Sequence, residues 1–345
     1  MSGMRTTLSI APAFALATAS LLAFADKASA APMGGVNLAG GEFNAGRRPG
    51  VYAKDYIYPD ARVARPFIDM GMHAVRVPVL WERLQPVARE PLSSTELARF
   101  DKALAGLRQF DLIIIDIHNY GKWQGKRLDQ IDGGARHLAD LWTRLAHHYK
   151  ADRKIAFGLM NEPNGISPAA WRRIVDPSVA AIRRTGARNL ILVPGSKWTG
   201  AHSWTTGGAD SNARAFADFR DPGGNYALEM HQYLDQDSSG THPDCVGPDV
   251  ARRRMQAATS WLRATRHRAF LGEFGAGPGE QCLASLDALL GHLRQNDDVW
   301  TGWAYWAGGG WWGNRYPMTL QPDKGRPRPQ AAVVGRYVKA GRAGR

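Results

Sequence analysis

Two glutamates stand where buried strands should end. The first lies in Asn161-Glu162-Pro163, directly after the apolar run 155–160. Pro163 cannot donate to a β-ladder and forces an extended conformation on the residue before it, so the strand must end there. The second, Glu273, follows the apolar residues 269–271 and precedes a Phe-Gly break. Two carboxyl groups held side by side can act as a proton donor and a nucleophile or base on a glycosidic bond.

Either glutamate alone has an ordinary structural explanation, as a helix cap or a salt-bridge partner. The pair is harder to explain in that way, because both follow apolar strands and one lies within Asn161-Glu162-Pro163. Perturbed carboxylates that meet at one place are candidates for acid and base roles. The pair therefore favours catalysis.

Strand-like and helix-like segments alternate along the whole chain. The expected strands are 35–39, 74–79, 112–118, 155–161, 190–193, 226–233, 269–273 and 300–306. The expected helices are 61–70, 94–110, 134–150, 168–185, 212–219, 248–266, 283–295 and 330–340. Within 94–110, for example, apolar residues recur at spacings of three and four, which is typical of an amphipathic helix.

This alternation predicts an α/β fold, a (β/α)8 TIM barrel, as one domain over residues 31–345. The alternative is a doubly wound open sheet, but no G-x-G-x-x-G motif follows a strand. In a barrel of parallel strands the active site lies at the carboxyl ends of the strands. Besides the glutamates, the polar and aromatic residues expected there are Arg76, His118, Asn119, Asn161, His231, Tyr233 and Trp306.

These residues carry a resemblance to glycoside hydrolase family 5, over essentially the whole chain from Gly35 to Trp306. The family's active-site set is an arginine, a histidine, an Asn-Glu pair, a His-x-Tyr, a second glutamate and a tryptophan, in that order. Three further stretches resemble its bacterial endo-β-1,4-glucanase branch: Gly35-Val36-Asn37-Leu38-Ala39-Gly40, Asp116-Ile117-His118-Asn119-Tyr120, and Ser239-Gly240-Thr241-His242 leading to Cys245.

The resemblance implies a retaining endo-β-1,4-glucanase that needs no cofactor and no metal. Glu162 would be the acid/base and Glu273 the nucleophile, and Arg76 and Tyr233 would hold Glu273. Asn161 would bind the sugar 2-hydroxyl, and the two histidines would bind hydroxyls or position Glu162. Trp306 would be the platform beside the cleaved bond. Indole rings suit the apolar faces of pyranoses, so Trp123, Trp198 and Trp204 in loops after strands are further candidates for glycan contact.

Two other functions remain open from the sequence. The same scaffold could act on mannan, xyloglucan or a mixed-linkage glucan, because mannose differs from glucose at a single hydroxyl. A non-catalytic carbohydrate-binding protein is a more remote alternative, since a decayed site would have lost at least one of these residues.

Cys245 and Cys282 are the only two cysteines. An even pair suggests one disulfide if the chain is exported, as the N-terminal segment described below predicts, and both cysteines are expected in loops after strands that would be neighbours. Two free buried thiols are the alternative. The endoglucanase branch bridges cysteines in the matching loops, so the resemblance supports the disulfide.

Residues 1–30 are predicted to be a signal peptide, with Arg5, an apolar stretch and Ala28-Ser29-Ala30 before the cleavage point. The mature protein is expected to be secreted or periplasmic, monomeric and not membrane-bound. The formal net charge is +13. The basic residues are scattered, which argues against nucleic acid as a partner. The expected partner is the β-glucan that the resemblance implies.

Overall fold

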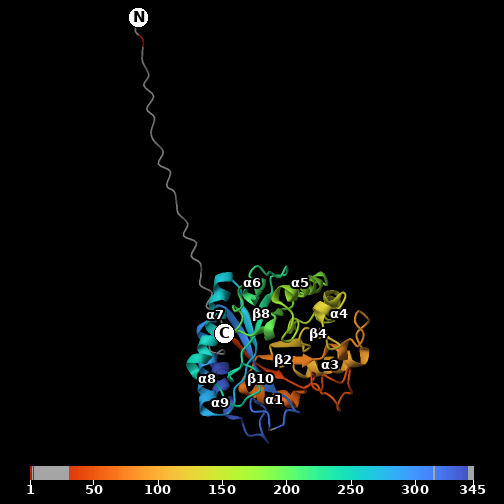
Figure 1. The fold of residues 1–345 in the computed structure, drawn as a ribbon, viewed down its shortest axis with the longest axis vertical. Helices are drawn as coiled ribbons and strands as arrows, with labels where there is room; N and C mark the ends of the chain where they lie inside the picture. The colour runs from red at the N-terminus through yellow and green to blue at the C-terminus, as the bar shows by residue number, and fades with distance from the viewer. Residues whose placement is uncertain (2, 4–30, 314, 341–345) are drawn as a thin grey trace.

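The computed structural model describes residues 1, 3, 31–313 and 315–340. A closed barrel of parallel strands forms its centre (Figure 1). The strands are β1 (Met33–Leu38), β2 (Ala74–Val79), β3 (Leu112–Ile117), β6 (Ile155–Gly158), β7 (Ile191–Pro194), β8 (Tyr226–His231), β9 (Ala269–Glu273) and β10 (Trp300–Gly308). Because β1 pairs with both β2 and β10, the sheet has no open edge. The predicted (β/α)8 barrel is confirmed, and the open sheet is excluded.

Helices surround the barrel in the positions that the amphipathic segments predicted (Figure 1). They are α1 (Ala61–Met70), α3 (Ser94–Gly106), α4 (Gly134–Tyr149), α5 (Pro168–Arg184), α6 (Asn212–Phe216), α7 (Pro248–Thr265), α8 (Glu280–Gln295) and α9 (Pro329–Ala340). The loops carry α2 (Trp81–Leu84), the hairpin β4 (Lys122–Trp123) and β5 (Lys126–Arg127), and the turns η1 (Leu128–Gln130), η2 (Lys197–Thr199) and η3 (Gly208–Asp210).

Local signals explain where α1 begins and ends. The Asp60 carboxylate accepts hydrogen bonds from the backbone N–H groups of Arg62 and Val63, which have no partner within the helix. Gly71 ends the helix at φ 97°, in the left-handed region that glycine occupies without strain.

A cluster of apolar side chains fills part of the interior of the barrel. Seven strands contribute one buried residue each to it: Ala74, Ile114, Ala156, Leu192, Ala227, Phe270 and Ala304. Layers of this kind make a TIM barrel a packed core instead of a pore. The polar residues of the same strands, such as Arg76 after Ala74 and Glu229 after Ala227, lie nearer the carboxyl ends.

Several strands end earlier than the sequence predicted. β6 ends at Gly158 and not at Asn161, and β3 ends one residue before His118. Asn161 still donates its backbone N–H to the carbonyl of Ile117, so the chain stays beside β3 after the regular ladder stops. His118 and Asn161 therefore lie on short irregular extensions of the strands, whereas Arg76, His231 and Glu273 lie within regular strands.

The predicted signal segment 1–30 lies almost wholly outside the described residues. Among the helices of the part of the chain that the structure describes, none is both long and apolar enough to cross a bilayer.

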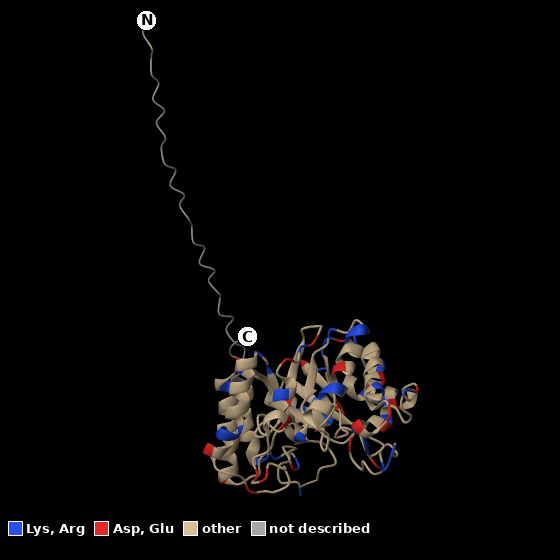
Figure 2. Cartoon of the chain, turned by 45° about the horizontal axis from the view of Figure 1, so that its top comes forward, with Lys and Arg blue, Asp and Glu red and all other residues tan. Residues whose placement is uncertain are grey.

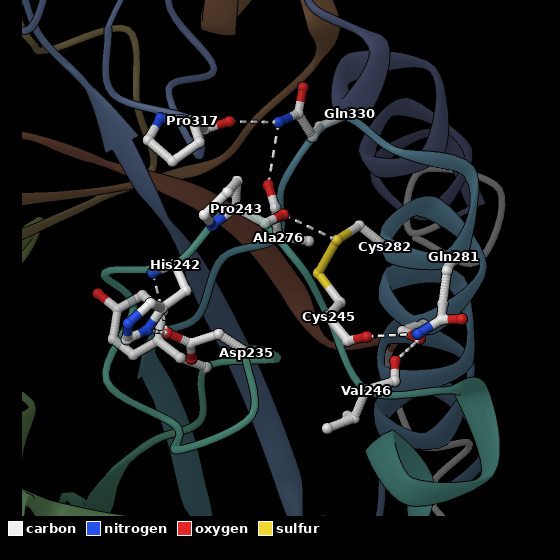
Figure 3. Close-up of a disulfide and its surroundings, with 12 residues drawn as sticks. Asp235, His242, Pro243, Cys245, Val246, Ala276, Gln281, Cys282, Pro317 and Gln330 are labelled. Carbon is white, nitrogen blue, oxygen red and sulfur yellow. Dashed lines mark hydrogen bonds and ion pairs between the residues drawn. A yellow bond between two sulfur atoms is a disulfide. The ribbon is translucent and has the colours of Figure 1, made fainter.

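The predicted bridge between Cys245 and Cys282 is present, with Cα atoms 5.0 Å apart (Figure 3). Cys245 lies in the loop between β8 and α7. Cys282 lies in the first turn of α8 and not in a loop, because this helix starts three residues earlier than predicted. The bridge therefore ties a loop at the barrel mouth to an outer helix.

Replacing both cysteines by alanine is expected to lower the free energy of unfolding by about 3–4 kcal/mol, because the bridge closes a long stretch of chain in the unfolded state. Urea unfolding of the wild type and the double variant measures this difference. The denatured, unreduced wild type should show no free thiol, and titration of two thiols would contradict the bridge.

Basic and acidic residues are scattered over the helices and loops of the described chain (Figure 2). Arg65–Asp69, Arg144–Asp140 and Arg172–Asp176 are i,i+4 ion pairs on helix surfaces. Two other arginines on helices hold loops. Arg183 makes a bidentate pair with Asp221, and Arg254 donates to three backbone carbonyls.

Candidate active site

Glu273, the last residue of β9, is held by two donors. Arg76 Nη1 donates to its Oε1 at 2.8 Å, and the Tyr233 hydroxyl donates to its Oε2 at 2.8 Å. The side chain is 5 % exposed. Each oxygen thus has a strong partner, and hydrogen bonds to a carboxylate orient it as well as stabilise its charge.

Glu162 follows β6 in an unusual backbone conformation. Its φ of 41° lies in the left-handed region, which costs energy for a residue with a Cβ and is found most often at functional sites. This conformation turns the carboxyl group toward β8, where Glu162 Oε1 lies 2.8 Å from His231 Nδ1. One oxygen of Glu162 and one of Glu273 lie within 4.8 Å of each other.

Burial raises the pKa of Glu162, and the nearby negative charge of Glu273 raises it further. The hydrogen bond from His231 opposes these effects without cancelling them. The pKa of His231 itself is raised to about 10, since the charges of Glu273 and Glu162 outweigh the effect of burial. His231 Nδ1 bonds to Glu162 Oε1, which leaves Oε2 to carry the acid proton.

Asn161 is fixed by two neighbours. Its Oδ1 accepts from Arg76 Nη2 at 2.8 Å, so its Nδ2 must be the atom 3.1 Å from His118 Nε2. His118 Nδ1 in turn lies 2.6 Å from Asp116 Oδ2, and the ring stacks on Trp306 at 5.5 Å. The amide and the imidazole thus occupy single orientations at the mouth of the barrel.

Two buried acids that the sequence analysis missed complete the site. Asp116 Oδ1 lies 3.1 Å from Arg76 Nη2, and Glu229 Oε1 lies 2.9 Å from Arg76 Nε. Their charges keep Arg76 protonated despite complete burial. The sequence contained a signal for both acids. Each stands two residues before a histidine that was predicted at the site, and residues two apart on a strand point to the same side.

Glu42, in the loop after β1, was also missed. Its Oε2 accepts from the backbone N–H of Gly40 at 2.8 Å, and burial raises its pKa to about 7. No strand-end pattern marks this residue in the sequence.

Asn119 has a supporting place in the structure. Its Oδ1 accepts from the backbone N–H of Trp81 and its Nδ2 donates to Glu82, both at 2.8 Å. The amide is 7 % exposed, so its contacts tie the loops after β2 and β3 together.

The three loop tryptophans have different surroundings. Trp198 is 50 % exposed and lines a cavity of about 770 Å³ that Glu162 and Tyr120 also line. Trp123 is half-buried, with its ring centroid 6.3 Å from that of Trp81 and 5.8 Å from that of His137. Its contact with glycan stays a prediction.

The prediction that Trp204 contacts sugar is wrong. Trp204 is fully buried, and its ring packs against Phe216 and Trp261 at 6.0 and 5.7 Å. The loop after β7 turns back, because Ala201 donates its N–H to the carbonyl of His231 and Ala213 donates to that of Trp204. The indole therefore points into the outer helical layer.

Two clusters among the described residues bring possible metal ligands within 4.8 Å of one another: Glu162, His231 and Glu273, and Asp235, Asp237 and His242. In the first, the ligand atoms already bond to one another and to Arg76 and Tyr233. In the second, the Asp235 carboxylate already accepts backbone and hydroxyl hydrogen bonds.

Comparison with known proteins gives a consistent result. The profile of the family Cellulase (glycosyl hydrolase family 5) matches residues 28–309. The chain belongs to this family and is a glycoside hydrolase. It is 34 % identical to a probable endo-β-1,4-glucanase B of Neosartorya fischeri, covering 93 % of this chain and 94 % of that protein.

Solved structures show the same similarity at higher identity. An endo-β-1,4-glucanase from Xanthomonas axonopodis pv. citri is 44 % identical, with a TM-score of 0.87, over 90 % of this chain and 99 % of that one. XacCel5A, solved in complex with cellopentaose, is 45 % identical, with a TM-score of 0.87, over 89 % of this chain and 99 % of that one. The resemblance to the bacterial branch is thus confirmed, although the curated relatives include fungal enzymes.

Proposed function

We propose that this protein is a retaining endo-β-1,4-glucanase, which hydrolyses internal β-1,4-glucosidic bonds by double displacement. The observation that carries the proposal is the pair Glu162 and Glu273, with oxygens within 4.8 Å of each other. Retaining glycosidases hold their carboxyl groups about 5–5.5 Å apart, whereas inverting enzymes need roughly 6.5–9.5 Å for a water molecule. The short separation supports retention.

In the first step Glu162 protonates the glycosidic oxygen while Glu273 attacks the anomeric carbon. The bond to the leaving sugar breaks and a glycosyl–Glu273 ester forms. In the second step Glu162, now a carboxylate, removes a proton from water, and the water oxygen displaces Glu273. The raised pKa of Glu162 suits the first role, and its loss of a proton suits the second.

Arg76 and Tyr233 hold Glu273 in a single orientation, so little reorganisation is needed during attack. One N–H of Asn161 Nδ2 points to His118, and the other remains for the 2-hydroxyl of the sugar bound to Glu273. Trp306 offers a ring face to that sugar. These assignments rest on the hydrogen-bond geometry and on the family's pattern.

The names of the related enzymes favour a β-1,4-glucan as substrate. Release of reducing sugar from carboxymethylcellulose, mannan and lichenan, measured side by side, tests this choice. The β-anomer should appear first in the NMR spectrum of the products. A mannan preference would contradict the substrate, and an α-product would contradict retention.

The export route and the assembly are part of the proposal. The signal-like segment before residue 31 supports secretion or transport to the periplasm, where the Cys245–Cys282 bridge can form. We propose a monomer that binds β-glucan, with no membrane and no nucleic acid as partner.

Trp198→Ala is expected to raise KM for carboxymethylcellulose by about 2- to 13-fold, since the stacking of a ring face is worth roughly 0.5–1.5 kcal/mol. The ring lies in the cavity beside the acid Glu162 and would bind the leaving part of the chain. Turnover of a small aryl cellobioside should change little, because its leaving group does not reach that far.

The same assay measures the mode of attack. For an endo-acting enzyme, viscosity should fall well before reducing ends accumulate. Trp311→Ala is a matched control, because Trp311 is also exposed but does not line this cavity. Equal effects of the two variants, or release of one short product with unchanged viscosity, would contradict the assignment of Trp198 or the endo mode.

A further inference from the structure

The segment from Tyr233 to Val246 is a compact loop whose ends are tied together. Val246 donates its N–H to the carbonyl of Leu234 at 2.8 Å. The side chain of Arg254 on α7 donates to the carbonyls of Tyr233 and Asp235 at 3.0 and 2.8 Å. The disulfide through Cys245 attaches the same loop to α8. Loops with such closed ends pack on themselves and often carry function. We call residues 234–246, the part of this segment after Tyr233, the mouth loop.

Asp235 is the centre of the mouth loop. Its side chain is fully buried and accepts hydrogen bonds from the Ser239 hydroxyl at 2.9 Å and from the N–H groups of Gly240 and Thr241 at 3.1 and 3.0 Å. His242 donates its N–H to the same carboxylate at 3.2 Å, as Figure 3 shows. Hydrogen bonds to a charged acceptor are stronger than neutral ones, so this carboxylate determines the path of residues 239–242.

Gly240 lies directly against the ring of Tyr233. A Cβ atom at Gly240 would come within 2.7 Å of the ring carbons Cδ1 and Cε1, which is closer than real Cβ contacts come. Its φ of 74° is also favourable only for glycine. The backbone of the mouth loop is thus the wall behind Tyr233, whose hydroxyl donates to Glu273.

We infer that the mouth loop positions the nucleophile: Asp235 and Gly240 are positioning residues that act on Glu273 through the ring of Tyr233. The inference rests on the proposed function, in which Glu273 attacks the sugar. Other residues of the same loop, among them Asp237, Ser239 and Thr241, line the cavity that Glu162 and Trp198 also line. One loop therefore forms both a wall of the leaving-group cavity and the support of the nucleophile.

The test compares Gly240→Ala with Gly224→Ala. Gly224 also has a positive φ, 66°, but a Cβ there meets nothing within 4 Å, so this control carries the backbone strain without the contact. The measurement is the rate at which a 2-deoxy-2-fluoro-β-cellobioside with a dinitrophenolate leaving group labels Glu273, followed by peptide mass. Gly240→Ala should slow labelling about 10- to 100-fold, the effect of losing one hydrogen bond to a charged group. KM for an aryl cellobioside should change much less than kcat.

Tyr233→Phe gives the reference effect, because it removes only the hydroxyl that bonds to Glu273. If Gly240 acts through this hydroxyl, adding Gly240→Ala to Tyr233→Phe should slow labelling by less than about threefold further. Fully multiplicative effects would overturn the inference, and so would equal labelling rates for Gly240→Ala and Gly224→Ala.

Asp235→Asn is the second variant, for the case in which Gly240→Ala does not fold. The Asp235 side chain forms hydrogen bonds only within the mouth loop. Slowed labelling with a normal circular dichroism spectrum would support the inference, and labelling at the wild-type rate would overturn it. Failure of the proposed function has a different signature. In that case the wild-type protein itself would carry no label on Glu273, and the inference would fall with it.

Discussion

Glu273→Gln is expected to lower turnover of cellooligosaccharides roughly 10⁴-fold or more, because an amide cannot attack the anomeric carbon and the covalent route is lost. The fold should persist. Arg76 loses one of its three carboxylate partners, but Asp116 and Glu229 remain 3.1 and 2.9 Å from the guanidinium. Steady-state kinetics and circular dichroism of the purified variant measure both effects.

A glycine at the same position makes this prediction specific to the nucleophile. Glu273→Gly opens space on the side of the sugar from which Glu273 attacks, and azide can enter there. With an activated aryl cellobioside, azide should restore turnover and give an α-glycosyl azide, since only one displacement occurs. A β-azide product, or near-normal activity of Glu273→Gln, would contradict the assignment.

Glu162→Gln is expected to have the second largest effect, a loss of about 10²- to 10⁴-fold on cellooligosaccharides, which is the usual contribution of a general acid. The loss in kcat/KM should be much smaller for a dinitrophenyl cellobioside, because this leaving group departs without a proton. Burial and the charge of Glu273 raise the pKa of Glu162. The wild-type enzyme should therefore keep its protonated acid to higher pH than an ordinary glutamate would, and lose activity as pH rises above that raised pKa.

In Glu162→Gln this alkaline fall should disappear from the kcat/KM profile measured with cellooligosaccharides, because their leaving group is the one that needs the proton. Glu42→Gln is the matched control. Glu42 is also buried, with its pKa raised to about 7, but makes no hydrogen bond to either catalytic glutamate. If the alkaline fall vanished in Glu42→Gln and remained in Glu162→Gln, Glu42 would be the group that titrates.

The alternation of apolar strands and amphipathic helices was enough to predict the barrel and most element boundaries to within three residues. A barrel made of consecutive βα units depends on local periodicity, which the sequence displays directly. The same rule placed Arg76, His118, Glu162, His231 and Glu273 at one end of the barrel. The carboxyl ends of the parallel strands of a barrel meet at that end, however far apart the residues stand in the sequence.

The sequence by itself therefore predicted the fold, the strand ends at which the candidate catalytic residues meet and, with two free thiols as the alternative, the bridge between the two cysteines. It could not determine which way a loop turns, and the tryptophans show why. Trp198 and Trp204 stand six residues apart in the same loop, yet one is half exposed beside Glu162 and the other is buried. Both have the same side chain, so only long-range backbone bonds, such as that from Ala201 to His231, decide between cavity and core.

The pKa values of the buried charged groups were likewise decided by the tertiary structure alone. Asp116 and Glu229 raise the pKa of the buried Arg76, and burial together with the charge of Glu273 raises the pKa of Glu162; these groups come from different strands and the segments after them. The support of Tyr233 by Gly240 is a contact between a ring and a backbone that no residue pattern encodes. Coulomb energies and packing contacts change over a few ångströms, whereas sequence patterns specify periods and faces but not distances.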